Sequence, residues 1–132
     1  MPLDPQELLV NVDDLAWKPM GEGAWGKVLH VCAETGSWTV MLKQAAGSEV
    51  PPHKHLAPAE FYVLQGAVEY RGGVAKLGHF AREPMGAVHL NTRFSEETIY
   101  LFTSHGPLAM YGPDGNVVAV TDAEAMQGLR ES

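Results

Sequence analysis

The chain carries four residues whose side chains could together bind one divalent metal ion. His53 and His55 are two positions apart, Glu60 follows five residues later, and His89 lies further along. Residues two apart in a strand point to the same face, so these two imidazoles should aim together, and Pro51-Pro52 stiffens the segment before them. Three imidazoles and one carboxylate suit Fe, Mn, Ni, Cu or Zn, whereas Mg and Ca prefer oxygen ligands. We therefore expect a mononuclear transition-metal site at His53, His55, Glu60 and His89.

Glu60 decides how many coordination positions such a metal keeps for other molecules. As a firm ligand to an octahedral ion it leaves two adjacent positions open, and if it detaches it leaves three. Tyr62 is two residues beyond Glu60, and a strand would place both side chains on one face. We expect both residues to be catalytic. Metal affinity should fall at low pH, because the histidines must be neutral to bind.

Short segments bounded by turn residues indicate an all-β fold. Fourteen glycines and nine prolines separate runs that are rich in Val, Tyr, Phe, Trp and Leu. Thr121 and Glu124 form a capping box that predicts a C-terminal helix over 121–130, and 5–10 could form one helical turn. About eight strands in a chain of 132 residues favour one jelly-roll or small-barrel domain over 1–132. The expected strands are 25–32, 37–44, 60–70, 74–80, 87–90, 98–103, 108–111 and 116–120.

The composition excludes several classes of partner. A formal net charge of -7 and scattered basic residues argue against nucleic acid and anionic membrane surfaces, which need a basic face. Cys32 is the single cysteine, so the sequence has no internal disulfide that would point to secretion. The N-terminus lacks the pattern of a signal peptide, and no apolar stretch approaches the ~20 residues of a membrane span. We expect a cytoplasmic protein, and exposed edge strands favour a homodimer.

Two stretches of the chain resemble the paired motifs of the cupin superfamily, Gly-x5-His-x-His-x3,4-Glu-x6-Gly and Gly-x5-Pro-x-Gly-x2-His-x3-Asn. The closing Asn of the second motif falls at Arg93, while Asn91 stands two positions early. The resemblance implies a cupin double-stranded β-helix, a jelly-roll barrel, with one bound metal ion. The matching positions are Gly47, His53, His55, Glu60 and Gly66 in the first motif, with one residue fewer before its final glycine, and Gly78, Pro84, Gly86 and His89 in the second.

The segment 97–116 resembles the corresponding part of cupin dioxygenases that cleave carbon–carbon bonds, such as those acting on 2,4'-dihydroxyacetophenone and acetylacetone. This likeness implies Fe(II), with Zn, Ni or Mn as other candidates, and dioxygen with a small β-diketone or hydroxyketone as substrates. The metal would chelate the enol oxygens and activate the carbon that dioxygen attacks. The same segment also resembles the cupin domain of zinc anti-sigma factors. Two alternatives stay open: a non-catalytic metal- or ligand-binding sensor, and a cupin isomerase or lyase that uses the metal as a Lewis acid.

Several other side chains have both a functional and a purely structural interpretation. Gln65 and Arg93 could hold a polar group of the substrate or could simply be solvated. His30, His79 and His105 are not expected to be ligands. Five aromatic or apolar side chains could line a pocket beside the metal or simply pack in the core. They are Trp38, Tyr62, Tyr100, Phe102 and Met110.

Overall fold

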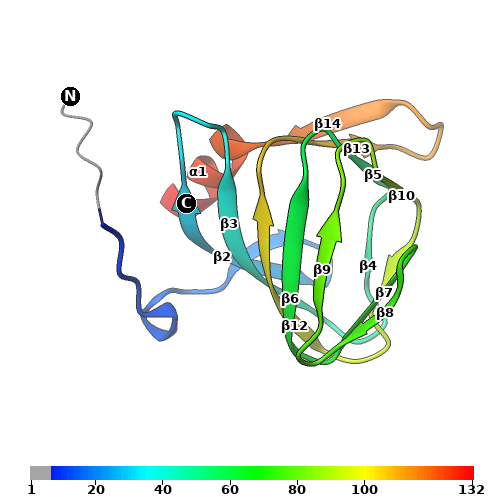
Figure 1. Ribbon diagram of the computed structural model, residues 1–132, viewed down its shortest axis with the longest axis horizontal. Helices are drawn as coiled ribbons and strands as arrows, with labels where there is room; N and C mark the ends of the chain where they lie inside the picture. The colour runs from blue at the N-terminus through cyan, green and yellow to red at the C-terminus, as the bar shows by residue number, and fades with distance from the viewer. Residues whose placement is uncertain (1–6) are drawn as a thin grey trace.

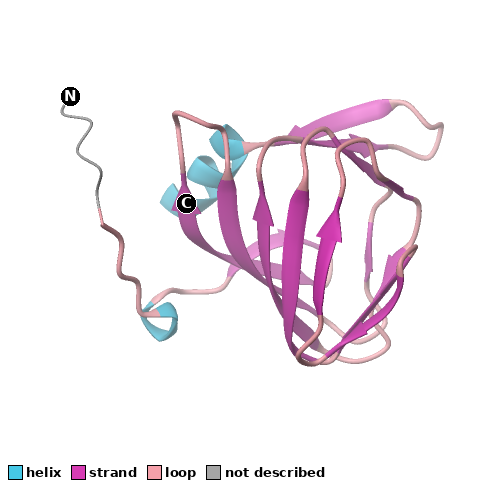
Figure 2. Ribbon diagram, in the orientation of Figure 1, coloured by secondary structure: helices cyan, strands magenta, loops and turns pink. Residues whose placement is uncertain are grey.

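The computed structural model describes residues 7–132, which form a barrel of three antiparallel sheets (Figures 1 and 2). The largest sheet has the order β1 (Lys18–Gly21), β2 (Ala24–Val31), β3 (Trp38–Gln44), β12 (Thr98–Ser104), β6 (Ala59–Gln65) and β9 (Phe80–Glu83). The second sheet has the order β10 (Val88–His89), β5 (His53–His55), β13 (Leu108–Tyr111) and β14 (Val117–Thr121). The third has the order β4 (Glu49–Val50), β11 (Thr92–Arg93), β7 (Ala67–Tyr70) and β8 (Gly73–Lys76).

The core fills the space between the large sheet and the two small ones. Strand β12 shows the pattern most clearly, because every second residue from Thr98 to Ser104 is buried and the residues between them are partly exposed. Aromatic contacts join the layers: Phe61 of β6 packs edge-on against Tyr70 of β7, and Phe102 of β12 lies against His55 of β5. This packing fixes the inner faces that carry the polar cluster described below.

The all-β cupin jelly roll expected from the sequence is confirmed, with some strands divided differently. The expected strand over 60–70 is two strands, β6 and β7, separated by Gly66, whose φ of 77° is left-handed. The expected strand over 74–80 is also divided, because a turn after Lys76 separates β8 from β9. The sequence did not predict β1, β4, β11 or nearly all of β9. Each of these strands is only two to four residues long, too short for a clear alternating pattern.

The expected C-terminal helix is present but begins later than predicted. Helix α1 (Ala123–Glu131) is capped by Asp122, whose carboxylate accepts a hydrogen bond of 2.9 Å from the backbone N–H of Ala125. Thr121 was the predicted cap, but it stays in β14, where it pairs with Leu108. The helix lies near β2 and β14 (Figure 1).

The expected helical turn over 5–10 lies partly outside the described residues, and residues 7–10 are not helical. The first helical element is the 3-10 turn η1 (Val12–Asp14). Within residues 7–132, no helix is long and apolar enough to cross a membrane.

Candidate metal centre

Three histidines and one carboxylate meet inside the barrel. His53, His55, Glu83 and His89 are all buried, and each offers a ligand atom that lies within 4.8 Å of the others. The three imidazole rings have centroids 5.0 to 5.2 Å apart. The structure therefore brings together the three histidines singled out in the sequence, with a different carboxylate beside them.

The backbone of the second sheet places these histidines. His53 and His55 share the inner face of β5, with Lys54 turned the other way. Strand β10 pairs with β5 so that His89 lies directly opposite His53. Residues opposite each other in an antiparallel pair stand about 5 Å apart, so the ladder itself sets the spacing of the two side chains.

Hydrogen bonding leaves the ring nitrogens of the cluster available to a metal. His53 Nδ1 lies 2.9 Å from the carbonyl oxygen of Pro51, which can only accept, so Nδ1 carries the hydrogen and Nε2 keeps its lone pair. Both ring nitrogens of His55 and of His89 are buried without a hydrogen bond of good geometry. Leaving a buried polar atom unpaired costs about 1–3 kcal/mol, so a group that binds these nitrogens would remove a substantial penalty.

Glu83 lies beside two of these histidines, His55 and His89. Its Oε2 atom is 2.9 Å from His55 Nε2 and 2.5 Å from His89 Nε2. The 2.5 Å separation is shorter than an ordinary N–H···O hydrogen bond, and neither Nε2 directs an N–H at the carboxylate. Nitrogen and oxygen atoms that converge on one region without bonding one another form a donor set typical of a transition-metal site.

Burial and the neighbouring charges shift the pKa values of the cluster in ways that suit metal binding. Burial lowers the pKa of His53 to about 4, so this imidazole is neutral near pH 7. Burial alone would raise the pKa of Glu83, but the contacts with His55 and His89 outweigh it and lower this pKa to about 2. A neutral imidazole and an ionised carboxylate are the protonation states that bind a divalent ion.

The expectation for Glu60 is corrected by the structure. Buried Ala59 and Phe61 form the inner face of β6, and Glu60 between them points to the outer face. There the Glu60 Oε1 atom is 2.7 Å from His105 Nε2. Tyr62 shares this outer face and is 42% exposed, so neither of the residues expected to be catalytic reaches the cluster.

Glu83 was missed although the sequence held a signal for it. It lies in β9, where Ala81 and Glu83 face inward and Arg82 faces outward. It is the only carboxylate between Gly78 and His89. The expected strand over 74–80 stops short of Glu83, so the residue was not assigned to a strand.

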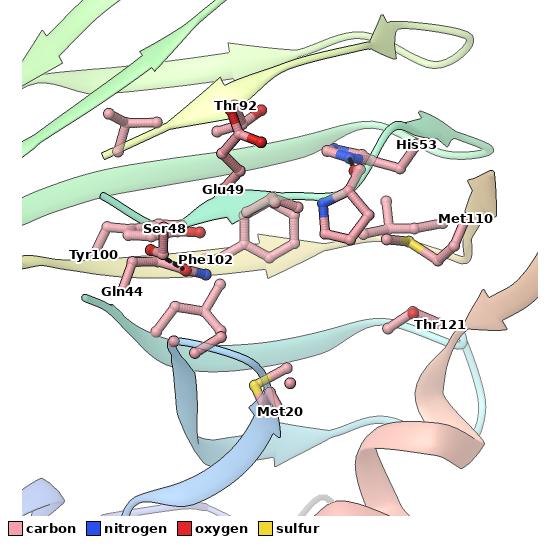
Figure 3. Close-up of a pocket in the computed structure, with 18 of the residues that line it drawn as sticks. Met20, Gln44, Ser48, Glu49, His53, Thr92, Tyr100, Phe102, Met110 and Thr121 are labelled. Atoms are coloured by element: carbon pink, nitrogen blue, oxygen red, sulfur yellow. Dashed lines mark hydrogen bonds between the residues drawn. The ribbon is translucent and has the colours of Figure 1, made fainter. Parts of the chain in front are cut away.

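A cavity of about 930 Å³ extends from the cluster through the barrel (Figure 3). His53 and Glu83 line it, together with four of the five residues suggested as a pocket wall, Trp38, Tyr100, Phe102 and Met110. Tyr62 is not part of the lining, because it lies on the outer face of β6.

The other polar candidates lie away from the cavity. Gln65 is exposed and bonds the Glu97 carboxylate at 3.0 Å. Arg93 forms an exposed ion pair with Glu49 at 3.2 Å. His79 is exposed and bonds the backbone N–H of Lys76.

Comparison with known proteins places this arrangement in a family. The model of the ChrR cupin-like domain matches residues 5–109. The chain belongs to the ChrR cupin-like family. Within curated proteins, this cupin is 32% identical to the acetylacetone-cleaving enzyme of Acinetobacter johnsonii, over 92% of this chain and 87% of that enzyme.

Solved structures extend the similarity to the whole cupin barrel. A protein of Methylibium petroleiphilum proposed to be an acetylacetone dioxygenase superposes with a TM-score of 0.92 and 31% identity, covering 100% of this chain and 99% of that one. The acetylacetone dioxygenase of Acinetobacter johnsonii gives 0.89 and 29% identity, covering 99% and 95%. The anti-sigma factor ChrR of Rhodobacter sphaeroides, in complex with SigE, gives 0.63 and 22% identity over 71% of this chain and 51% of that one, a likeness of fold alone.

Proposed function

We propose that this cupin is a metal-dependent dioxygenase that cleaves a carbon–carbon bond in a small β-diketone. The observation that carries the proposal is the buried cluster of three histidines and Glu83 at the wall of a large cavity. Its relatives support the reaction class, since a curated relative at 32% identity is an acetylacetone-cleaving enzyme. The whole chain 1–132 would act as one cupin domain.

The proposed ligands are His53, His55 and His89, with Glu83 as a fourth donor in place of Glu60. Fe(II) is the proposed metal, with Zn, Ni or Mn as other candidates. When bound, Fe(II) would supply a Lewis acid for the two substrate oxygens and electrons for dioxygen chemistry. Glu83 suits a donor better than a general base, because a pKa of about 2 is far below the operating pH.

The residues around the cluster would hold the substrate and exclude water. Phe102 lies against His55 with ring centroids 6.3 Å apart, and Tyr70 lies against His89 at 5.7 Å. Phe61 packs edge-on against Tyr70 at 5.5 Å, and these three rings all line the cavity. A β-diketone is flat in its enol form, and an aromatic wall fits such a shape.

Oxygen uptake by the Fe(II)-loaded protein tests the proposal directly. We expect uptake with one or more members of a panel of β-diketones, and one dioxygen consumed per bond cleaved. An iron-loaded sample that consumes no oxygen across the panel would overturn the dioxygenase. Product formation that continues under strict anaerobiosis would instead indicate an isomerase or lyase.

We also propose that the protein works in the cytoplasm as a homodimer. Its single cysteine, Cys32, is free, which suits a reducing compartment. Strand β14 is at the edge of its sheet and exposes Val117, Val118 and Val120, and an apolar edge of this kind favours pairing with a second copy.

A further inference from the structure

The cavity has a second polar group, far from the histidines. Gln44, at the end of β3, is only 3% exposed, and its Oε1 atom lies 3.1 Å from the Ser48 hydroxyl. Tyr100 stands beside the Gln44 amide and is 5% exposed. All three residues line the same cavity as His53 (Figure 3). We call Gln44, Ser48 and Tyr100 the distal polar group.

The distal polar group has unused hydrogen-bonding capacity. The Ser48 hydroxyl has one hydrogen, and its contact with the Ala45 carbonyl oxygen, at 2.6 Å, is shorter than its contact with Gln44. A primary amide can make four hydrogen bonds, two as donor and two as acceptor. The Ser48 hydroxyl accounts for one of these for Gln44. A buried amide that keeps such capacity at the wall of a cavity is placed to bond a polar group from outside the protein.

Strand geometry gives the separation between the two ends of the cavity. Phe102 lies against His55 and pairs with Val40 on β3, which marks the level of the histidines. Gln44 is four residues further along β3, and a rise of about 3.3 Å per residue gives ~13 Å between the backbone positions of Val40 and Gln44. Tyr100 pairs with Leu42 and is about half as far along. A five-carbon diketone cannot contact both ends at once. The apolar wall between them, formed by Leu42, Phe61 and Phe102, suits an aromatic ring.

From this arrangement we infer that the preferred substrate is an elongated β-diketone whose aromatic tail ends in a hydroxyl group held by Gln44 and Tyr100. The inference rests on the proposed function for the diketone head, while the distal polar group recognises the tail. A hydroxyl can donate and accept, so it matches either orientation of the Gln44 amide. Gln44 is thus a specificity-determining residue for this cupin.

A matched pair of compounds tests the inference without any mutation. In the Fe(II)-loaded protein, we expect kcat/KM for 1-(4-hydroxyphenyl)butane-1,3-dione to exceed that for 1-phenylbutane-1,3-dione by roughly fivefold to tenfold, the effect of one hydrogen bond. Acetylacetone should be poorer than both, since it leaves the apolar wall unfilled. Equal values for the two aryl compounds in the unmodified protein would overturn the inference.

Two variants assign the preference to a residue. Gln44→Met keeps the volume and removes the amide, so the ratio between the two aryl compounds should fall to about one. Gln65→Met makes the same change at an exposed glutamine outside the cavity and should keep the ratio. Should Gln44→Met fold poorly, Tyr100→Phe removes one hydroxyl from the same group and should lower the ratio in the same direction. A ratio unchanged in both Gln44→Met and Tyr100→Phe counts against the assignment.

Binding without turnover separates this inference from the proposed reaction. Calorimetric titration of the protein under argon should give a several-fold lower Kd for the hydroxylated compound, and the difference should vanish in Gln44→Met. If no diketone supports oxygen uptake but this binding difference persists, the dioxygenase fails and the distal polar group stands. If oxygen uptake is robust and the Kd values are equal, the dioxygenase stands and the inference fails.

Discussion

Ala59 faces Glu83 across the β6–β9 pair, and both side chains are buried inside the barrel. A methyl group opposite a carboxylate leaves room for the carboxylate to reach the imidazoles of His55 and His89. A larger residue at 59 would occupy the space into which Glu83 extends. The small residue in β6 and the acidic residue in β9 therefore form one structural unit beside the histidines.

The first prediction concerns the histidines as metal ligands. His89→Gln should lose most of the metal bound by the purified protein, because it removes one of three imidazoles from a buried cluster. The measurement is metal content per chain by elemental analysis after purification without chelators or a His tag. His79→Gln, which changes an exposed histidine, is the control and should keep its metal. Equal metal content in the two variants would contradict the assignment.

The second prediction separates the two carboxylates. Glu83→Gln should weaken metal binding by 10-fold or more, because it removes the ionised group that lies against His55 and His89. Glu60→Gln changes a carboxylate on the outer face that contacts His105, and its metal affinity should stay within about twofold. Competition with a chromophoric chelator measures both affinities. The reverse order of effects would restore Glu60 to the ligand set.

Part of this site could be predicted from the sequence, and strand direction explains the rest. In any strand, the spacing of His53 and His55 puts both side chains on one face, so their convergence could be predicted without knowing the rest of the fold. The direction of the Glu60 side chain depends on which face of β6 is buried. Tyr62 and Leu64 make the outer face of this strand as apolar in sequence as the inner face. The buried face of β6 could not be found by counting alternate residues onward from His55, because β5 and β6 belong to different sheets. Glu83 depended on β9, a four-residue strand whose pairing with β6 is a tertiary property.

The third prediction is the pH dependence of stability in the metal-free protein. The pKa of His53 is 6.5 in the reference state and about 4 when folded, so between these values the unfolded chain binds a proton that the folded chain does not. This contribution is fully present above pH 6.5 and is lost as the pH falls toward 4. Denaturant unfolding at pH 7 and pH 5 should show a loss of about 2 kcal/mol, at 1.36 kcal/mol per pH unit.

The matched control for this effect is His53→Gln, which cannot titrate in this range. Its unfolding free energy should change by about 2 kcal/mol less than that of the unmodified protein between the same pH values. Parallel pH profiles for the two proteins would show that His53 is not the group responsible.

The fourth prediction concerns the glycine between β6 and β7. Gly66 has a left-handed φ of 77°, and a Cβ there would lie 2.5 Å from the backbone oxygen of Glu97. Gly66→Ala should therefore cost more than about 2 kcal/mol of unfolding free energy, because strain and collision add. Gly115→Ala shares the left-handed backbone, with φ 82°, but has open space around the new methyl group, and should cost only about 1 kcal/mol. Thermal unfolding of the two variants compares them.

The fifth prediction tests the proposed homodimer. Val117→Lys places a charge on the exposed edge strand β14 and should shift the protein from dimer to monomer in sedimentation equilibrium. Val74→Lys changes a valine of similar exposure, 51% against 53%, on β8 at the edge of another sheet, and should leave the dimer intact. A monomeric unmodified protein at micromolar concentration would refute the proposal.

The position of β5 inside its sheet has a kinetic consequence. This three-residue strand is hydrogen-bonded on both sides, to β10 and to β13, so the backbone under His53 and His55 cannot move alone. Shifting either histidine by a backbone movement would then require a cooperative opening of several strands. We expect the amide hydrogens of β5 to be among the slowest to exchange with solvent, so that the histidine pair is preorganised before an ion arrives.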